Sequence, residues 1–135
     1  MIFEYNNFLW LNTMPEIKKD EIREERIDME IIVDAYGTEE QAMGWYYYLE
    51  DKIQFPFTAR CIKNVGKSPL RKGEEVIVIK MADEEECSHG MFVEINWNNR
   101  SFYIPLEQLQ PINTDDETME AVEDWHYWIA RGYEL

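Results

Sequence analysis

The segment from residue 30 to residue 57 constrains the fold more than any other part of this chain. An apolar run ends at Asp34, a break follows at Gly37, and a second helix-forming run begins at Thr38. Thr38 and Gln41 have the spacing of a capping box, in which each side chain satisfies one free backbone N–H of a new helix. Gly37 suits the left-handed conformation that ends a helix. The sequence therefore predicts two helices that meet at a corner, with carboxylates on both sides of the bend and aromatic residues beneath it.

Two helices have further sequence signals: the helix that enters this corner, and one near the C-terminus. Pro15 suits a first helical turn, where its missing N–H costs nothing, and the isoleucine stripe after it predicts a helix over residues 16–35. Near the end of the chain, an apolar stripe that contains two tryptophans predicts the second of these helices. We expect Asp115 or Asp116 to cap that helix and Gly132 to end it.

The region between residues 58 and 112 has the pattern of a small β-domain. Asn98 and Asn99 tolerate the positive φ of a tight hairpin, and one helical turn is expected at residues 106–109. Short β-branched or alternating segments predict five strands, at residues 58–62, 75–81, 91–97, 101–104 and 110–112. Such an arrangement predicts a small SH3-like β-barrel, which removes exposed sheet edges by closing on itself. The predicted fold class is α+β, with the barrel flanked by an N-terminal helical hairpin and a C-terminal helix.

Net charge limits the partners that the chain can bind. The sequence has 28 Asp and Glu residues against 13 Lys and Arg residues, which leaves a formal charge of −15 at pH 7. A field of this sign repels nucleic-acid phosphates and anionic membranes, and it attracts cations and basic proteins. We therefore expect no nucleic-acid or membrane partner, while a basic protein is a candidate partner.

Length and composition indicate one domain. We expect residues 1–15 to form an N-terminal extension and residues 16–135 to form a single acidic domain, because 135 residues suit one hydrophobic core. Two cysteines supply no disulfide framework. The chain has no apolar run of membrane-spanning length, and its start lacks the basic segment of a signal peptide. These features lead us to expect a cytoplasmic protein.

Familiar enzyme motifs are absent from the sequence. It contains no GxGxxG, P-loop, GxSxG or HExxH motif, and its two histidines, His89 and His126, lie far apart. We therefore predict that the protein is not an enzyme.

Acidic clusters are the strongest remaining feature, and three interpretations of them stay open. The first is a metal site, because carboxylate oxygens are the ligands that calcium prefers, and calcium accepts six to eight of them in flexible geometry. The second is an acidic protein-interaction module, or a nucleic-acid mimic that occupies the binding surface of a basic protein. The third is a plain barrel with no metal role, because the EF-hand pattern is absent and charged runs are usually solvated surface.

Several long strings of the sequence favour the metal interpretation through a resemblance. Residues 26–36 and 39–52 resemble the small acidic calcium-binding proteins without EF-hands that were first recognised in cyanobacteria, the CcbP-like family. Phe55–Phe57, Met81–Cys87 and Asp124–Trp128 are similar to that family as well. The resemblance implies that residues 16–135 are a calcium-binding domain that acts as a buffer or a sensor. In cyanobacteria, such a protein is linked to the control of heterocyst differentiation.

The calcium ligands are predicted from the positions of the acidic residues. We expect Glu30 and Asp34 to project from the first helix and Glu39 and Glu40 to project from the first turn of the second. Either of the two acids at the end of the second helix, Glu50 and Asp51, is expected to close this site. A second, weaker site is predicted from a separate set of acidic residues: Asp83, Glu84, Glu85, Glu86 and Asp124.

Overall fold

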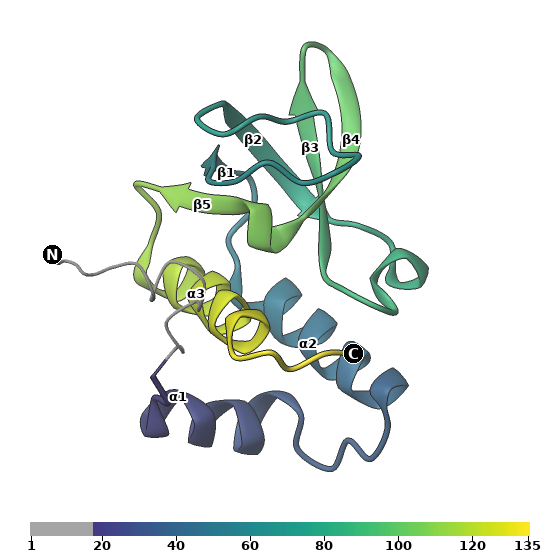
Figure 1. The fold of residues 1–135 in the computed structure, drawn as a ribbon, viewed down its shortest axis with the longest axis vertical. Helices are drawn as coiled ribbons and strands as arrows, with labels where there is room; N and C mark the ends of the chain where they lie inside the picture. Colours follow the sequence, from purple (N-terminus) through teal and green to yellow (C-terminus); the bar gives the residue numbers. More distant parts are fainter. Residues whose placement is uncertain (1–17) are drawn as a thin grey trace, which may run out of the picture.

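The computed structural model describes residues 18–135, which form an antiparallel sheet packed against helices (Figure 1). Helices α2 and α3 lie between the sheet and α1 (Figure 1). The helical elements are α1 (Glu21–Arg26), the π-helical turn η2 (Ile27–Ile31), α2 (Thr38–Lys52), the 3-10 turns η3 (Glu84–Cys87) and η4 (Leu106–Gln108), and α3 (Asp116–Ala130). The strands are β1 (Phe57–Cys61), β2 (Glu75–Met81), β3 (Phe92–Trp97), β4 (Arg100–Pro105) and β5 (Leu109–Ile112).

The five strands pair in the order β4-β3-β2-β1-β5, and every pairing is antiparallel. Strands β4 and β5 are the edges, and within residues 18–135 no pairing joins them. The α+β class is thus confirmed, and the sheet as paired is open rather than closed into a barrel. Each predicted strand is present within two residues of its expected bounds. Asn98 and Asn99 form the β3–β4 turn with φ of 53° and 62°, as predicted.

The C-terminal helix α3 also agrees with its sequence signals. The carboxylate of Asp115 accepts hydrogen bonds from the backbone N–H of Thr118 at 3.0 Å and from its hydroxyl at 2.6 Å, so Asp115 is the cap. Gly132 has a φ of 91° just after the helix, which confirms it as the stop.

The corner between the first two helices differs from the prediction. The first helix does not span residues 16–35: Asp20 caps it, and its helical part ends at Ile31. The left-handed residue of the bend is Asp34, with a φ of 58°, whereas Gly37 is extended with a φ of −140°. Gly37 is therefore the N-cap of α2 and not the end of the preceding helix, and the predicted role of Gly37 is wrong.

The predicted capping box at Thr38 and Gln41 is wrong as well. Thr38 is the first residue inside α2, and the N-cap residue Gly37 has no side chain that could cap it. Instead, Glu40 reaches back across the bend, and its Oε1 accepts a hydrogen bond of 2.8 Å from the backbone N–H of Tyr36. A glutamate three residues into the helix thus satisfies a donor ahead of it, much as the second half of a capping box does.

An aromatic cluster between α2 and α3 forms the centre of the helical layer. Trp45 is fully buried, and its ring lies 5.0 Å from that of Trp125 and 5.5 Å from that of Trp128. Tyr46 and Tyr48 are also buried on α2, whereas Tyr47 is 54% exposed. The predicted aromatic layer beneath the corner is therefore present, and it is the surface against which α3 packs.

Gly44 allows the corner to close tightly. A Cβ at this position would lie 2.3 Å from the backbone oxygen of Ile31, far inside van der Waals contact. The backbone at the end of η2 therefore packs directly on the backbone of α2, and only glycine leaves room for it.

We predict that Gly44→Ala destabilises the protein, although alanine normally stabilises a helix interior by about 1 kcal/mol relative to glycine. The added methyl group meets a backbone carbonyl that cannot rotate away, and overpacking of this kind costs about 1–3 kcal/mol. Urea unfolding measures the change. Gly66→Ala is the control, because nothing lies within 4 Å of its Cβ position. A stabilised Gly44→Ala variant would contradict the close approach.

Candidate functional site

Four of the predicted ligands lie around one bend. Glu30 is in η2, Asp34 is in the turn, and Glu39 and Glu40 are in the first turn of α2, and all four side chains are exposed. Within residues 18–135, no hydrogen bond or ion pair engages the carboxylates of Glu30, Asp34 or Glu39, whereas Glu40 uses one oxygen on the backbone of Tyr36. The N-terminal end of α2 favours negative charge through the helix dipole. We call these four residues the corner carboxylates.

A hollow of about 350 Å³ lies against the inner side of this bend. Glu24, Asp28, Ile32, Gln41 and Glu134 are among the residues that line it. Sequence reasoning missed Asp28 and Glu134, which both line this hollow. Asp28 lies two residues before Glu30, and Glu30 lines a separate hollow with Glu25 and Arg26. Glu134 had no signal in the sequence, because only the packing of the C-terminal segment brings it to this place.

Glu50 and Asp51 do not lie near the corner carboxylates. They are at the opposite end of α2, and 11 residues of helix separate Glu39 from Glu50, a rise of about 17 Å. A calcium ion binds its ligands at about 2.3–2.6 Å, so one ion cannot contact both ends. The structure thus separates Glu50 and Asp51 from the site that they were expected to close.

Glu50 lies instead near the acidic turn η3. The Tyr47 hydroxyl donates a hydrogen bond of 3.0 Å to Oε1 of Glu84. Burial raises the pKa of the neighbouring Tyr46 to about 12, with further contributions from the negative charges of Glu50, Glu84 and Asp83. These carboxylates therefore share one electrostatic environment. All four predicted residues of the second site outside α3 are exposed: Asp83, Glu84, Glu85 and Glu86.

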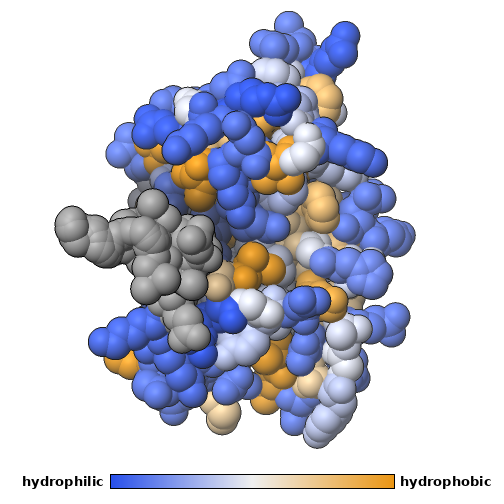
Figure 2. Space-filling model, viewed as in Figure 1, coloured by the Kyte–Doolittle hydropathy of each residue, from blue (hydrophilic) through white to orange (hydrophobic). Residues whose placement is uncertain are grey.

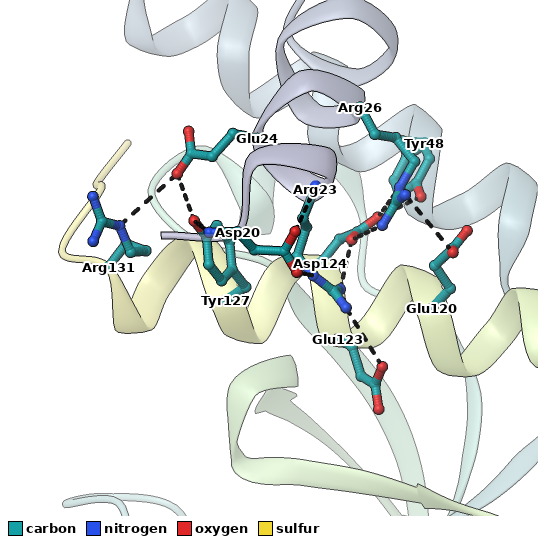
Figure 3. Close-up of polar contacts among 10 residues, drawn as sticks. All are labelled: Asp20, Arg23, Glu24, Arg26, Tyr48, Glu120, Glu123, Asp124, Tyr127 and Arg131. Carbon is teal, nitrogen blue, oxygen red and sulfur yellow. Dashed lines mark hydrogen bonds and ion pairs between the residues drawn. The ribbon is translucent and has the colours of Figure 1, made fainter. Parts of the chain in front are cut away.

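Asp124 lies apart from both groups and is fully buried (Figure 3). Its Oδ1 accepts hydrogen bonds of 2.7 Å from Arg23 and from Arg26, and its Oδ2 accepts bonds from Arg26 at 3.1 Å and from the Tyr48 hydroxyl at 2.7 Å. The hydrogen bond to Asp124 raises the pKa of Arg26, and burial together with that carboxylate raises the pKa of Tyr48. Both oxygens of Asp124 are therefore occupied by protein donors.

The corner carboxylates suit calcium by their chemistry, although they are not gathered in advance. Within the part of the chain that the structure describes, no three His, Cys, Asp or Glu side chains are placed to hold a metal ion together. Exposed carboxylate oxygens on a turn are hard donors that can move, and calcium tolerates the flexible geometry that they would give. These carboxylate oxygens fit calcium as ligands, and the side chains have to move toward the ion when it binds.

Comparison with known proteins decides the family. The protein-family model of CcbP-type calcium binding matches residues 25–129 of this chain. The chain belongs to this calcium-binding family. Calcium is accordingly its ligand, and both the predicted family and the predicted calcium binding are confirmed. No curated protein matches the chain.

Two solved structures extend this finding to the fold of the family. The crystal structure of Anabaena CcbP is 43% identical, with a TM-score of 0.80, and the match covers 90% of this chain and 100% of that chain. A calcium-binding protein in its calcium-binding form is 42% identical, with the same coverage and a TM-score of 0.79. The α+β architecture is thus shared with members of the family.

The limits of the domain are not addressed by the family match. The predicted N-terminal extension, residues 1–15, lies outside the described residues, so that division of the chain stays a prediction.

In the part of the chain that is described, no helix is long and apolar enough to cross a membrane.

We predict that Asp34→Asn leaves the stability of the calcium-free protein nearly unchanged, whereas Asp34→Ala destabilises it by about 1 kcal/mol. The backbone of Asp34 has the left-handed conformation, which asparagine tolerates. Most other residues destabilise the fold by about 1–2 kcal/mol when they adopt that conformation. Urea unfolding in a chelator measures both variants. Asp28→Ala, which removes a carboxylate from a helical residue, is the control. Equal losses for the two substitutions at Asp34 would contradict the strain argument.

Proposed function

We propose that the corner carboxylates Glu30, Asp34, Glu39 and Glu40 form the main calcium site. The observation that carries this proposal is their placement around one bend, with three carboxylates unpaired within the described chain. A bound calcium ion supplies positive charge at that bend. Carbonyl oxygens of the turn and water would complete the six to eight oxygens that calcium takes.

A second, weaker site is proposed around η3. Its oxygens would come from the two acids at the end of α2, Glu50 and Asp51, and from the four acids at the turn: Asp83, Glu84, Glu85 and Glu86. Asp124, the remaining predicted ligand, can take part only after its bonds to Arg23 and Arg26 break. At this site the Tyr47 hydroxyl already occupies one oxygen of Glu84.

We infer that the protein acts as a calcium sensor and not only as a buffer. The corner carboxylates are spread apart, so calcium binding has to change the shape of the bend. A sensor requires such a difference between its two states.

Cys61 and Cys87 are both free and buried, which suits a protein of the reducing cytoplasm. We propose a cytoplasmic calcium-binding protein without catalytic activity.

We further propose that the sheet belongs to the SH3-like class. The strand order β4-β3-β2-β1-β5 and the 3-10 turn directly before the last strand both support this assignment. A partly open barrel of this kind leaves β4 and β5 as edges.

We predict that calcium raises the thermal stability of the protein. A ligand that binds only the folded state at a hundred times its dissociation constant adds about 2.7 kcal/mol. For a domain of this size, that corresponds to a melting shift of several degrees. Melting curves in chelator and in millimolar calcium measure the shift. Identical curves would refute the proposal and favour the acidic interaction module.

Calcium affinity should depend on Asp34 specifically. We predict that Asp34→Asn weakens calcium binding tenfold or more, which is about 1.4 kcal/mol, because the substitution removes a ligand charge while the turn is preserved. Calorimetric titration measures the affinity.

The matched control for this substitution is Asp116→Asn. Asp116 is exposed in the first turn of α3, 12 residues before Trp128, which lines the hollow at the corner. That separation is about 18 Å along the helix, so only screened long-range charge connects Asp116 with the corner. Equal losses in both variants would mean that the corner is not the site, and η3 would become the better candidate.

A further inference from the structure

Helix α1 is attached to the body in an unusual way. None of its six residues is buried, and its one apolar residue, Ile22, is 76% exposed. Figure 2 shows apolar atoms exposed among hydrophilic ones at the lower edge of the molecule, where α1 lies. Hydrophobic burial is the dominant favourable term in folding, and α1 contributes almost none of it.

Polar contacts with α3 supply the attachment instead (Figure 3). Arg23 and Arg26 both reach Asp124 at 2.7 Å. Their side chains are only 21% and 19% exposed, and that of Asp124 is fully buried. The outer contacts are longer, at 3.8 Å from Arg23 to Glu123 and from Arg26 to Glu120. Charged pairs are therefore the main connection between α1 and α3.

A second set of contacts holds the start of α1. The backbone N–H of Asp20 donates a hydrogen bond of 2.9 Å to the Tyr127 hydroxyl, which donates one of 2.7 Å to Glu24. Tyr133 also donates to Glu24, at 3.1 Å. These groups are exposed or partly buried, so water can replace the contacts at little cost.

The chain just after α1 is fixed to the core. Ile27 and Ile31 are 2% and 4% exposed, and the backbone oxygen of Ile31 packs on Gly44. At Arg26 the helix also changes from α to π geometry. The chain therefore changes between Arg26 and Ile27. Polar contacts hold the helix before this point, and buried apolar side chains hold the segment after it.

The two arginines neutralise an acidic face of α3. Glu120, Glu123 and Asp124 are spaced three and four residues apart, so they share one face of that helix. Asp20, Glu21, Glu24 and Glu25 make α1 itself acidic, and without the arginine pairs the two helices would repel each other.

We propose that α1 is a hinged arm, closed by the pairing of Arg23 and Arg26 with Asp124, that opens about the Arg26–Ile27 boundary while the rest of the domain stays folded. The closed arm covers the acidic face of α3 with cations from the same chain. Any external cation or basic group that binds this face has to displace the arm first.

Hydrogen exchange of the full-length protein, read by mass spectrometry at constant calcium, tests the arm. In Asp124→Asn, we expect peptides that cover α1 to exchange at least tenfold faster, while peptides from α2 and the sheet change less than twofold. The wild type gives a second measurement that needs no variant. Raising the salt from about 0.05 M to 0.5 M screens the arginine pairs once they are exposed, so exchange should accelerate in α1 alone.

Glu123→Gln is the matched control, because it removes one negative charge from the neighbouring position but breaks only a contact of 3.8 Å. It should change α1 exchange less than twofold. Three outcomes would overturn the proposal. Exchange could accelerate equally in all peptides, which means that α1 opens only with the whole domain. Exchange in α1 could stay unchanged in Asp124→Asn. Finally, the two variants could behave alike, which means that overall charge and not Asp124 holds α1.

Discussion

The contact of Trp45 with Trp125 and Trp128 is the interaction on which the helical layer depends. A chain with a net charge of −15 repels itself, and both α2 and α3 begin with acidic residues. The burial of large apolar side chains opposes this repulsion, and truncating a buried tryptophan or phenylalanine typically costs about 3–5 kcal/mol. The aromatic cluster thus offsets the repulsion and lets the carboxylates remain on the outside, where calcium can reach them.

Most of the fold was predictable because its signals are local. Asn98 and Asn99 specify a hairpin wherever they occur between two strands, and Asp115 and Gly132 mark the ends of α3 by their own conformations. The corner was predicted incorrectly because its geometry depends on tertiary contact. The missing Cβ of Gly44 lets the end of η2 approach α2, and the bend is then completed by Asp34, not by Gly37. The pattern of residues at the bend does not show that Gly44, seven residues beyond Gly37, sets its geometry.

For the candidate site, sequence analysis proposed a set of carboxylates, and the structure shows how they are grouped. The length of α2 separates Glu50 from Glu39, and this could have been inferred from the predicted helix itself. Asp124 is a different case. It lies between Ala121 and Trp125 on the buried face of α3, and a carboxylate in such a place needs a partner. Arg23 and Arg26 are spaced to supply one, but only the docking of α1 on α3 shows that they do.

The two classes of carboxylate in this protein are neutralised by different means, for a physical reason. Asp124 is removed from water, and a buried charge without a partner would cost several kcal/mol, so for as long as it is buried its counterions have to come from the chain itself. The corner carboxylates remain in water, where repulsion between like charges costs only a few tenths of a kcal/mol per pair. The folded state therefore does not depend on a cation at the corner. A fold that pairs its buried acid internally and tolerates unpaired carboxylates at its surface can exist both with and without the metal, which is what reversible calcium binding requires.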